Sequence, residues 1–413
     1  MARPTLAALV IASRRRLLGA AAALGLAQRP GRSSAATTWS LSALPAPEAL
    51  AQLHPHADGG WLAIGASGRL WALGANIPPR AMAEDLDPWT PLAAGHGRIA
   101  ARRADGRLWV GGSAGDAWLS DEGVNRHAGL LVLPLAIIAV AGDAADARVL
   151  RFEPGPRGRW QVVARGRDAV LPDARPLQVD LDGRGDGGHL VVLGGPDTRR
   201  YAHAVLGDGI EATRVLLLER HGLQPLRTLD LLAPQVLEDI APRAWAGGLI
   251  SMLSDEQGAR LVRIEADTAD PAGLKITASG QPIGTRHRWM SASTDGQRLV
   301  AVHMPHLSGV LTVYRHSGDR LIGQALASGL SNHAIGTREL DVSAWHEGEF
   351  LVPDAASRRL RRFDVNAARE LEPIDLPERP RQIASTRGHG DLGLLGDDGR
   401  AWRLARAATG QGK

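Results

Sequence analysis

The 413-residue chain has no cysteine, and its aromatic residues are few and mostly tryptophan (11 Trp, 3 Phe and 2 Tyr). The absence of cysteine excludes disulfide bonds, thiolate metal sites and c-type haem attachment. The sequence also contains no phosphate-binding loop and no H-E-x-x-H zinc motif. Packing and hydrogen bonds must therefore stabilise the fold. The sequence carries neither of these two enzyme signatures.

Lysine is nearly absent, so arginine supplies almost all of the 48 basic residues behind the formal charge of +4. Residues 1–36 hold six arginines and no acidic residue. Without those six, 42 basic residues face 44 acidic ones, a balance of about −2. The excess positive charge belongs to the N-terminal segment, and we expect no nucleic-acid partner.

The N-terminal segment resembles a twin-arginine signal peptide. Arg14, Arg15 and Arg16 precede a short run of Ala, Gly and Leu over residues 19–26, and small residues follow at 33–36. A membrane anchor or a buried helix is the alternative, but the run is shorter than the ~20 residues that cross a bilayer. We expect residues 1–36 to be a leader for export to the periplasm or the medium, with no membrane span once it is removed.

Short strands joined by turns are predicted for the rest of the chain, because 49 Gly and 25 Pro are spread along it and no long segment has a helical period. Three segments share a strand, a tight turn with Gly after Ser or Asp, and a second strand with a Trp at the same place. They are Gly60–Gly74 with Trp71, Gly97–Gly111 with Trp109, and Gly390–Leu404 with Trp402. We expect these Trp side chains to pack between neighbouring sheets.

A second type of hairpin recurs from the middle of the chain onward. Its copies are Val149–Phe152 with Trp160–Ala164, Val215–Glu219 with Leu226–Leu229, Leu261–Glu265 with Leu274–Ala278, Val310–Arg315 with Leu321–Ala325, and Leu360–Val365 with Leu371–Leu376. Together the hairpins give eight units of about 40 to 65 residues, each able to supply up to four antiparallel strands. This pattern predicts an all-β propeller with eight blades, or with seven as the alternative.

The last unit lacks a fourth strand, whereas Thr38 to Leu41 forms a strand without a partner. We predict that this N-terminal strand completes the last blade and closes the ring, which leaves few open strand edges. The predicted propeller domain covers residues 37–407, and a disordered tail is expected over 408–413.

One loop, over Val179 to Gly194, has the sequence VDLDGRGDGGHLVVLG. It resembles the FG-GAP/VCBS repeat, whose calcium loop has the form D-x-D-G-D-G-x-x-D before a strand, and the resemblance covers about residues 170–400. The family implies a propeller with metal sites in the loops between first and second strands. Asp180, Asp182 and Asp186 are the candidate calcium ligands, because alternate carboxylates converge on a hard cation. Arg184 stands at the third ligand position, so an ion pair that stabilises the turn is the alternative.

An arginine comes directly before the predicted first strand in each of the last five units. In a propeller that strand lines the central channel, so the five guanidinium groups are expected to ring one channel mouth, where each can bind a carboxylate or a phosphate. These residues are Arg175, Arg243, Arg288, Arg338 and Arg381. Ion pairs with Asp or Glu of neighbouring blades are their alternative role.

Four histidines are predicted on the same face, in loops of two adjacent units: His287, His303, His306 and His333. With the arginines they are candidate ligand-binding residues, and converging imidazoles can also bind a metal or exchange protons. Ordinary exposed loop histidines are the alternative.

The sequence thus favours a monomeric, non-catalytic periplasmic binding or scaffolding protein, which uses this face for an anionic small molecule or a protein partner. A periplasmic propeller enzyme, such as a quinone-cofactor dehydrogenase or a lyase, is the alternative. Calcium is the one cofactor that a motif indicates.

Overall fold

Alternating apolar residues between glycine turns give this chain strands and almost no helix. The computed structural model describes residues 39–56, 59–75, 77–112, 116–144, 146–181, 188–385 and 390–406. These residues form 33 strands and two short 3-10 helices, Pro156–Gly158 and Ala204–Leu206. No helix among them is long and apolar enough to cross a membrane. All of them belong to one structural unit, Thr38–Ala408.

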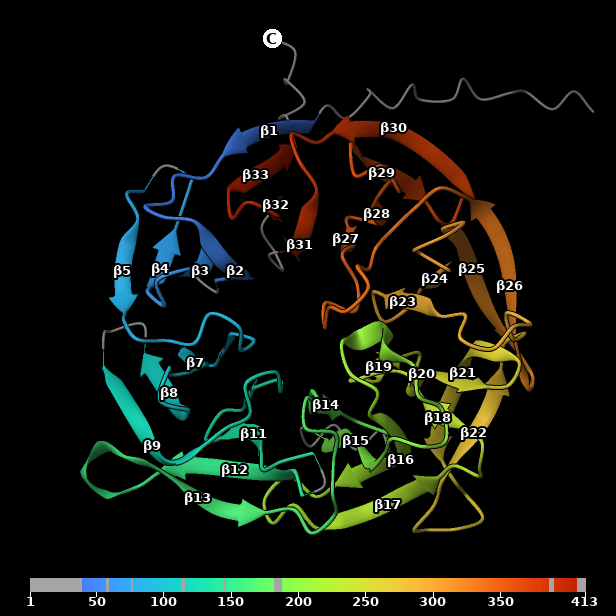
Figure 1. The fold of residues 1–413 in the computed structure, drawn as a ribbon, viewed down its shortest axis with the longest axis horizontal. Coiled ribbons are helices and arrows are strands. Elements are labelled where there is room, and N and C mark those ends of the chain that lie inside the picture. Colours follow the sequence, from blue (N-terminus) through green and yellow to red (C-terminus); the bar gives the residue numbers. More distant parts are fainter. Residues whose placement is uncertain are drawn as a thin grey trace, which may run out of the picture. The chain divides into compact units, whose positions relative to one another are not determined.

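Successive antiparallel strands form eight groups, or blades, arranged around a ring (Figure 1). Bridges between neighbouring blades join blades 2 and 3, and blades 4 to 6, into larger sheets. Blade 1 contains β2 (Leu50–Pro55), β3 (Trp61–Gly65), β4 (Leu70–Leu73) and β5 (Arg80–Ala83). Blade 2 contains β6 (Ala93–Gly95), β7 (Arg98–Arg102), β8 (Arg107–Gly112) and β9 (Ala117–Gly123). Blade 3 contains β10 (Leu131–Val132), β11 (Ile137–Ala141), β12 (Arg148–Pro154) and β13 (Trp160–Arg165). Blade 4 contains β14 (Leu177–Val179), β15 (His189–Asp197), β16 (Glu211–Leu218) and β17 (Pro225–Asp230).

The second half of the ring repeats this arrangement. In blade 5, β18 (Val236–Leu237) and β19 (Arg243–Trp245) both pair with β20 (Gly248–Asp255), followed by β21 (Gly258–Ala266) and β22 (Leu274–Ser279). Blade 6 contains β23 (Met290–Thr294), β24 (Leu299–His303), β25 (Val310–Ser317) and β26 (Arg320–Ala327). Blade 7 contains β27 (Ala344–His346), β28 (Glu349–Pro353), β29 (Arg359–Asp364) and β30 (Arg369–Asp375). Blade 8 contains β31 (Pro380–Ser385), β32 (Asp391–Gly396), β33 (Ala401–Arg406) and β1 (Trp39–Ala43).

The N-terminal strand closes the ring. β1 pairs antiparallel with β33, from Trp39 opposite Arg406 to Ala43 opposite Trp402. Blade 8 therefore takes its outer strand from one end of the described chain and its other three strands from the opposite end (Figure 1). The predicted propeller class and its closure by the N-terminal strand are confirmed, although Thr38 itself lies outside the described residues.

Apolar side chains from neighbouring blades pack into shared clusters. One cluster joins Trp71 of blade 1 to blade 8, a second joins Trp109 of blade 2 to blade 1, and a third joins Trp402 of blade 8 to blade 7. The three tryptophans thus pack between sheets, as predicted. Burying one large apolar side chain stabilises a fold by roughly 1.5–3 kcal/mol, so each blade depends on the next for part of its stability.

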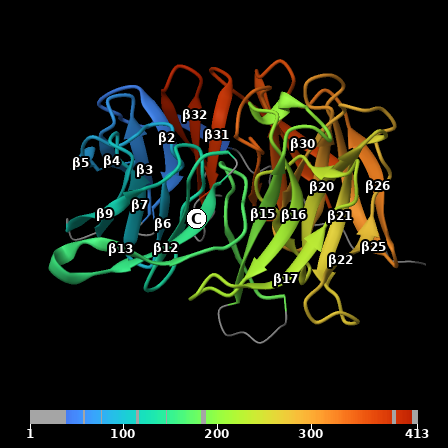
Figure 2. The same cartoon turned by 60° about the horizontal axis from the view of Figure 1, so that its bottom comes forward.

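The strands run between two ends of the ring (Figure 2). Because neighbouring strands are antiparallel, the loops from second to third strand and the loops from one blade to the next emerge at the same end. We call this end the loop face. It carries the segments 84–92, 166–176, 198–210 and 328–343, which contain most of the residues considered below.

Two glutamates approach loop-face turns of blades 1 and 8 in the same way. The Glu48 carboxylate accepts a hydrogen bond from the indole N–H of Trp71 at 2.9 Å. A Cβ atom on Gly65 would lie 2.2 Å from Glu48 Cδ, and one on Gly396 would lie 2.2 Å from Glu378 Cδ. A Cβ atom would displace these carboxylates, so glycine permits the approaches, which hold the chain just before β2 and β31, two strands that carry cavity residues.

Candidate binding cavity on the loop face

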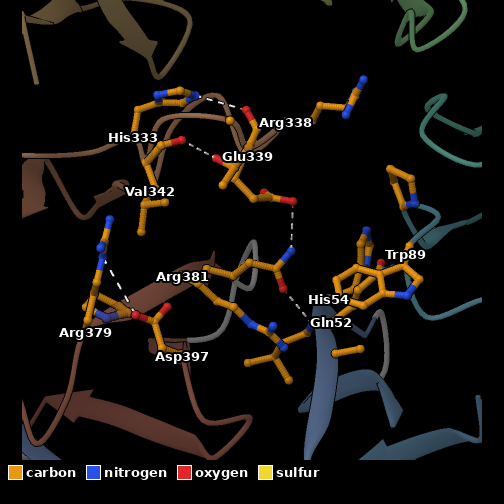
Figure 3. Close-up of a pocket in the computed structure, with 18 of the residues that line it drawn as sticks. Gln52, His54, Trp89, His333, Arg338, Glu339, Val342, Arg379, Arg381 and Asp397 are labelled. Atoms are coloured by element: carbon orange, nitrogen blue, oxygen red, sulfur yellow. Dashed lines mark hydrogen bonds and ion pairs between the residues drawn. The ribbon is translucent and has the colours of Figure 1, made fainter. Parts of the chain in front are cut away.

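A cavity of about 510 Å³ lies between the inner strands of blades 1 and 8 (Figure 3). Most of its wall comes from β2, from β31 and from the loops before β6, β27 and β31. The rest comes from the loops before β10 and β14, from β28 and the turn after it, and from the turn between β32 and β33. Among the described lining residues, the arginines are Arg175, Arg338, Arg379 and Arg381, and the carboxylates are Glu339 and Asp397. The wall therefore carries more basic than acidic groups.

Gln52 on β2 anchors the loop before β6. Its buried side-chain amide donates hydrogen bonds from Nε2 to the carbonyls of Pro88 (2.7 Å) and Thr90 (2.6 Å). Its Oε1 accepts a hydrogen bond from the Leu92 N–H at 3.0 Å. These three bonds hold the loop on either side of Trp89, because each joins a buried side chain to main chain.

Gln382 on β31 connects three blades at the cavity wall. Its Oε1 accepts a hydrogen bond from the Leu53 N–H of β2 at 3.0 Å. Its Nε2 donates to Glu339 Oε1 at 3.3 Å, in the loop before β27. Blades 8 and 1 and the loop from blade 7 therefore meet at this residue.

Arg175 and Arg381 have no carboxylate partner in the described part of the chain. Arg381 donates from Nη2 to the Leu50 carbonyl at 2.5 Å, and Arg175 donates from Nη2 to the Arg338 carbonyl at 2.6 Å. The Nε atom of each is buried without a hydrogen-bond partner among these residues. Burial lowers the pKa of Arg381, although the charges of Asp397, Glu339 and Glu378 oppose this shift.

Arg338, by contrast, forms ion pairs with two aspartates. Its Nε lies 2.7 Å from Asp173 Oδ2 and its Nη2 lies 2.5 Å from Asp208 Oδ2. Burial alone would lower the pKa of Arg338, but the hydrogen bond and charge of Asp173, with the charge of Asp208, raise it. Burial and the charge of Asp208 raise the pKa of Asp173. Arg338 thus links the loops before β14, β16 and β27, although it was predicted as a ligand-binding residue.

The five predicted arginines do not form one ring. Arg175, Arg338 and Arg381 line the cavity, as does the predicted histidine His333. Arg243 is the first residue of β19, and its Nη1 lies 3.1 Å from the buried Asp239. Arg288 is exposed in the loop before β23.

His333 and His306 form a hydrogen-bonded pair at the cavity wall. His333 Nε2 lies 3.1 Å from the Thr337 carbonyl, and its Nδ1 lies 3.0 Å from His306 Nε2. Since a carbonyl only accepts, the His333 proton is on Nε2 and His306 donates to the Nδ1. Burial and the neighbouring His306 lower the pKa of His333 to about 4, so it is neutral at pH 7. The remaining predicted histidine of blade 6, His303, lies 2.7 Å from the Tyr314 hydroxyl, and burial lowers its pKa to about 4.

His287 belongs to a separate group, together with Tyr201, His203 and Glu238. Its ring stacks on the His203 ring, with centroids 4.9 Å apart. The main-chain N–H of His287 donates a hydrogen bond to the Tyr201 hydroxyl at 2.6 Å. His203 Nδ1 is hydrogen-bonded to the fully buried carboxylate of Glu238. Burial and the charge of Glu238 raise the pKa of Tyr201 to about 12. These side chains therefore sit beside a buried negative charge.

Further carboxylates lie near Glu238. Burial, followed by the charge of Glu238, raises the pKa of Glu211 to about 10, so this side chain is protonated at pH 7. Burial also raises the pKa of Asp239 despite its pair with Arg243. We call the following set the acidic region: Asp173, Asp208, Glu211, Glu238 and Asp239.

No group of three or more His, Asp or Glu side chains in the described ranges is arranged to hold a metal ion. Of the candidate calcium ligands, Asp180 follows β14, whereas Asp182 and Asp186 lie outside the described residues. Calcium binding at this loop stays a prediction.

The structure adds cavity residues that sequence analysis missed, notably Gln52, Trp89 and Gln382. A signal for two of them is present. Glu48 precedes Gln52 by four positions, and Glu378 precedes Gln382 by the same number. Aligning blades 1 and 8 by the spacing of these residues would have placed both glutamines at one position of the inner strand. Trp89 has no counterpart of this kind, because it stands in a loop rather than in a repeated strand.

No protein-family model and no curated protein sequence matches the chain. Among solved structures, BamB from Moraxella catarrhalis is 13% identical, with a TM-score of 0.57 over 92% of this chain and 100% of that one. Saccharomyces cerevisiae Sqt1 is 12% identical, with a TM-score of 0.57 over 90% of this chain and 100% of its own. The Dos1 propeller is 9% identical, with a TM-score of 0.55 over 89% of this chain and 94% of that one.

These similarities, together with the ring of blades, define the chain as a β-propeller protein. At such low identity they show the fold alone. The resemblance to FG-GAP/VCBS repeats and to a twin-arginine leader stays a prediction from the sequence.

Proposed function

We propose that this chain is a non-catalytic periplasmic binding or scaffolding protein, whose loop-face cavity binds an anionic group of a small molecule or of a protein partner. The observation that carries this proposal is that Arg175 and Arg381 line the cavity with no ion pair to any described residue. A partly desolvated guanidinium gains most from a carboxylate or phosphate that it can bind through two N–H groups. Arg338 is less available, because two aspartates already pair with it.

Two hydroxyl groups in the cavity wall, those of Ser331 and Thr337, are engaged with main-chain carbonyls, which favours binding over catalysis. Thr337 Oγ1 donates to the Ala334 carbonyl at 2.8 Å, and Ser331 Oγ donates to the His333 carbonyl at 3.4 Å. Both imidazole nitrogens of His333 are taken by Thr337 and His306. A hydroxyl nucleophile needs an adjacent base, and these side chains are not paired in that way.

A binding experiment with matched variants tests the proposal. The protein without residues 1–36 is immobilised and exposed to an extract of the source cells, next to Arg381→Gln and Arg288→Gln variants. We expect a ligand or partner that the wild type and Arg288→Gln retain and Arg381→Gln loses, because Arg288 is exposed outside the cavity. Equal retention by Arg381→Gln would place the binding site elsewhere.

Export is tested separately from binding. Replacing Arg14 and Arg15 by lysine keeps the charge but removes the arginine pair that defines the leader type. We expect the double variant to accumulate in the cytoplasm in a cell fractionation, whereas wild type reaches the periplasm. Normal export of the variant would count against this route.

A further inference from the structure

The cavity wall contains an exposed tryptophan on a well-anchored loop. Trp89 is 60% exposed, although most tryptophans of the described chain are buried. Large aromatic side chains gain free energy by leaving water, so an exposed one in a cavity wall offers a surface to an apolar group. Figure 3 shows Trp89 and Arg381 among the side chains that surround this space.

The main chain around Trp89 is fixed independently of its ring. The Trp89 N–H donates to Asp87 Oδ1 at 3.0 Å, and Asp87 is buried and paired with Arg102 and Arg126. Gln52 holds the carbonyls on both sides of Trp89. Hydrogen bonds that do not involve the indole therefore fix the main chain of Trp89. This reduces the conformational entropy that is lost when a ligand binds.

The charges in the wall favour an anion with one negative charge. Arg381 and Arg175 are the lining arginines without a carboxylate partner in the described chain, whereas Arg379 has Asp397 at 3.9 Å. Glu339 and Asp397 remain in the wall and repel a second negative charge. A carboxylate meets these conditions better than a doubly charged phosphate monoester.

We propose, on the basis of the function proposed above, that this cavity binds a small molecule with one carboxylate and an aromatic body, the carboxylate on Arg381 and the ring against Trp89. The cavity volume of about 510 Å³ falls within the range of small-molecule sites, which is roughly 300–1,000 Å³. Prolines at 88, 91, 353 and 380 add rigid apolar surface to the wall.

Calorimetric titration with 3-phenylpropionate as the probe tests this proposal at low ionic strength. We expect saturable binding that weakens at least about tenfold for 3-phenylpropionamide, which lacks the charge, and for propionate, which lacks the ring. Phenyl phosphate as the dianion is expected to bind more weakly than the carboxylate. Binding of the amide as tight as that of the acid, or no saturable binding of the acid up to about 10 mM, overturns the proposal.

Variants assign the two contacts. Arg381→Gln keeps a polar side chain but removes the charge, and we expect about tenfold weaker binding of 3-phenylpropionate. Trp89→Ala is expected to weaken binding about fivefold or more. The matched controls are Arg288→Gln and Leu232→Ala, both at exposed loop-face positions outside the cavity lining. Equal losses in the controls and the cavity variants overturn the assignment.

The outcome is separable from that of the proposed function. If the extract experiment shows a partner that depends on Arg381 while 3-phenylpropionate does not bind, the ligand class is wrong and the cavity remains a binding site. If the extract experiment shows no partner that depends on Arg381 and 3-phenylpropionate does not bind, both proposals are overturned.

Discussion

Two regions of the loop face contain arginines and differ in what surrounds them. In the acidic region, Asp173 and Asp208 pair with Arg338, which also lines the cavity, and Asp239 pairs with Arg243. In the cavity between blades 8 and 1, Arg381 has a main-chain carbonyl instead of a carboxylate. Position on this face alone therefore does not predict a binding residue. The acidic partners decide whether a guanidinium holds loops together or is left to bind a ligand.

The regions also differ in how their charges are neutralised. The acidic region holds more carboxylates than cations, and it lowers its net charge by keeping Glu211 protonated. In the cavity, burial lowers the pKa of His333, so this side chain is neutral at pH 7. Perturbing each region should therefore affect different properties: stability and its pH dependence in the first, and ligand binding in the second.

The largest expected effect comes from Glu211. Its pKa is about 10 in the folded chain and near 4.5 when exposed, so the folded state holds a proton that the unfolded state loses. The stability from this group is complete below pH 4.5 and is lost as pH rises towards 10. Between pH 5 and 8 we expect the wild type to lose about 4 kcal/mol that Glu211→Gln does not lose, as measured by urea unfolding at several pH values. Parallel pH profiles for both proteins would show that Glu211 ionises normally.

Arg338→Ala is expected to have the next largest effect. It leaves the carboxylates of Asp173 and Asp208 close together without their shared cation, which should reduce the free energy of unfolding at pH 7 by about 3 kcal/mol. Arg288→Ala is the control, because this exposed side chain should change stability by less than about 0.5 kcal/mol. Adding Asp173→Asn to Arg338→Ala should restore part of the loss. Equal unfolding midpoints for Arg338→Ala and the control would mean that the ion pairs do not stabilise the loops.

Local patterns made much of the fold predictable. The hairpins around Ser67-Gly68, Asp105-Gly106 and Asp398-Gly399 are set by neighbouring residues, and β3–β4, β7–β8 and β32–β33 form at those positions. Closure by β1 was predictable for a related reason, since one strand and one incomplete blade were each left without a partner. Periodicity and turn residues carry this information without any knowledge of long-range contacts.

The site was less predictable because its contacts join distant parts of the chain. Arg338 pairs with Asp173 and Asp208 across 165 and 130 positions, and Arg381 reaches Leu50 across 331. The prediction from arginines before first strands therefore grouped Arg338, which pairs with two aspartates, with Arg381, which contacts a main-chain carbonyl. Only the ion-pair partner of an arginine shows whether it links loops or is available to a ligand. The sequence pattern of one blade does not predict which side chains of another blade lie beside it.

Arg381→Gln is expected to change stability by less than about 1 kcal/mol, which sharpens the contrast with Arg338. The shorter glutamine gives up one hydrogen bond to the Leu50 carbonyl, but no ion pair with a described residue is lost. Removing a partly buried charge also removes its desolvation penalty, which outweighs the attraction of the nearby carboxylates at this site. Urea unfolding at pH 7 measures this difference, and a loss as large as that of Arg338→Ala would make Arg381 a structural residue too.

The smallest expected effect on stability is that of Trp89→Ala, within about 0.5 kcal/mol of wild type. The indole is mostly exposed, and the hydrogen bonds that fix its loop run through Gln52, Asp87 and the main chain. Urea unfolding beside the exposed control Leu232→Ala measures the change. A clear destabilisation by Trp89→Ala alone would mean that the ring packs against the cavity wall in solution. A ring that is free of such packing is available to a ligand, so unchanged stability together with weakened binding separates the cavity from the ion-paired region next to it.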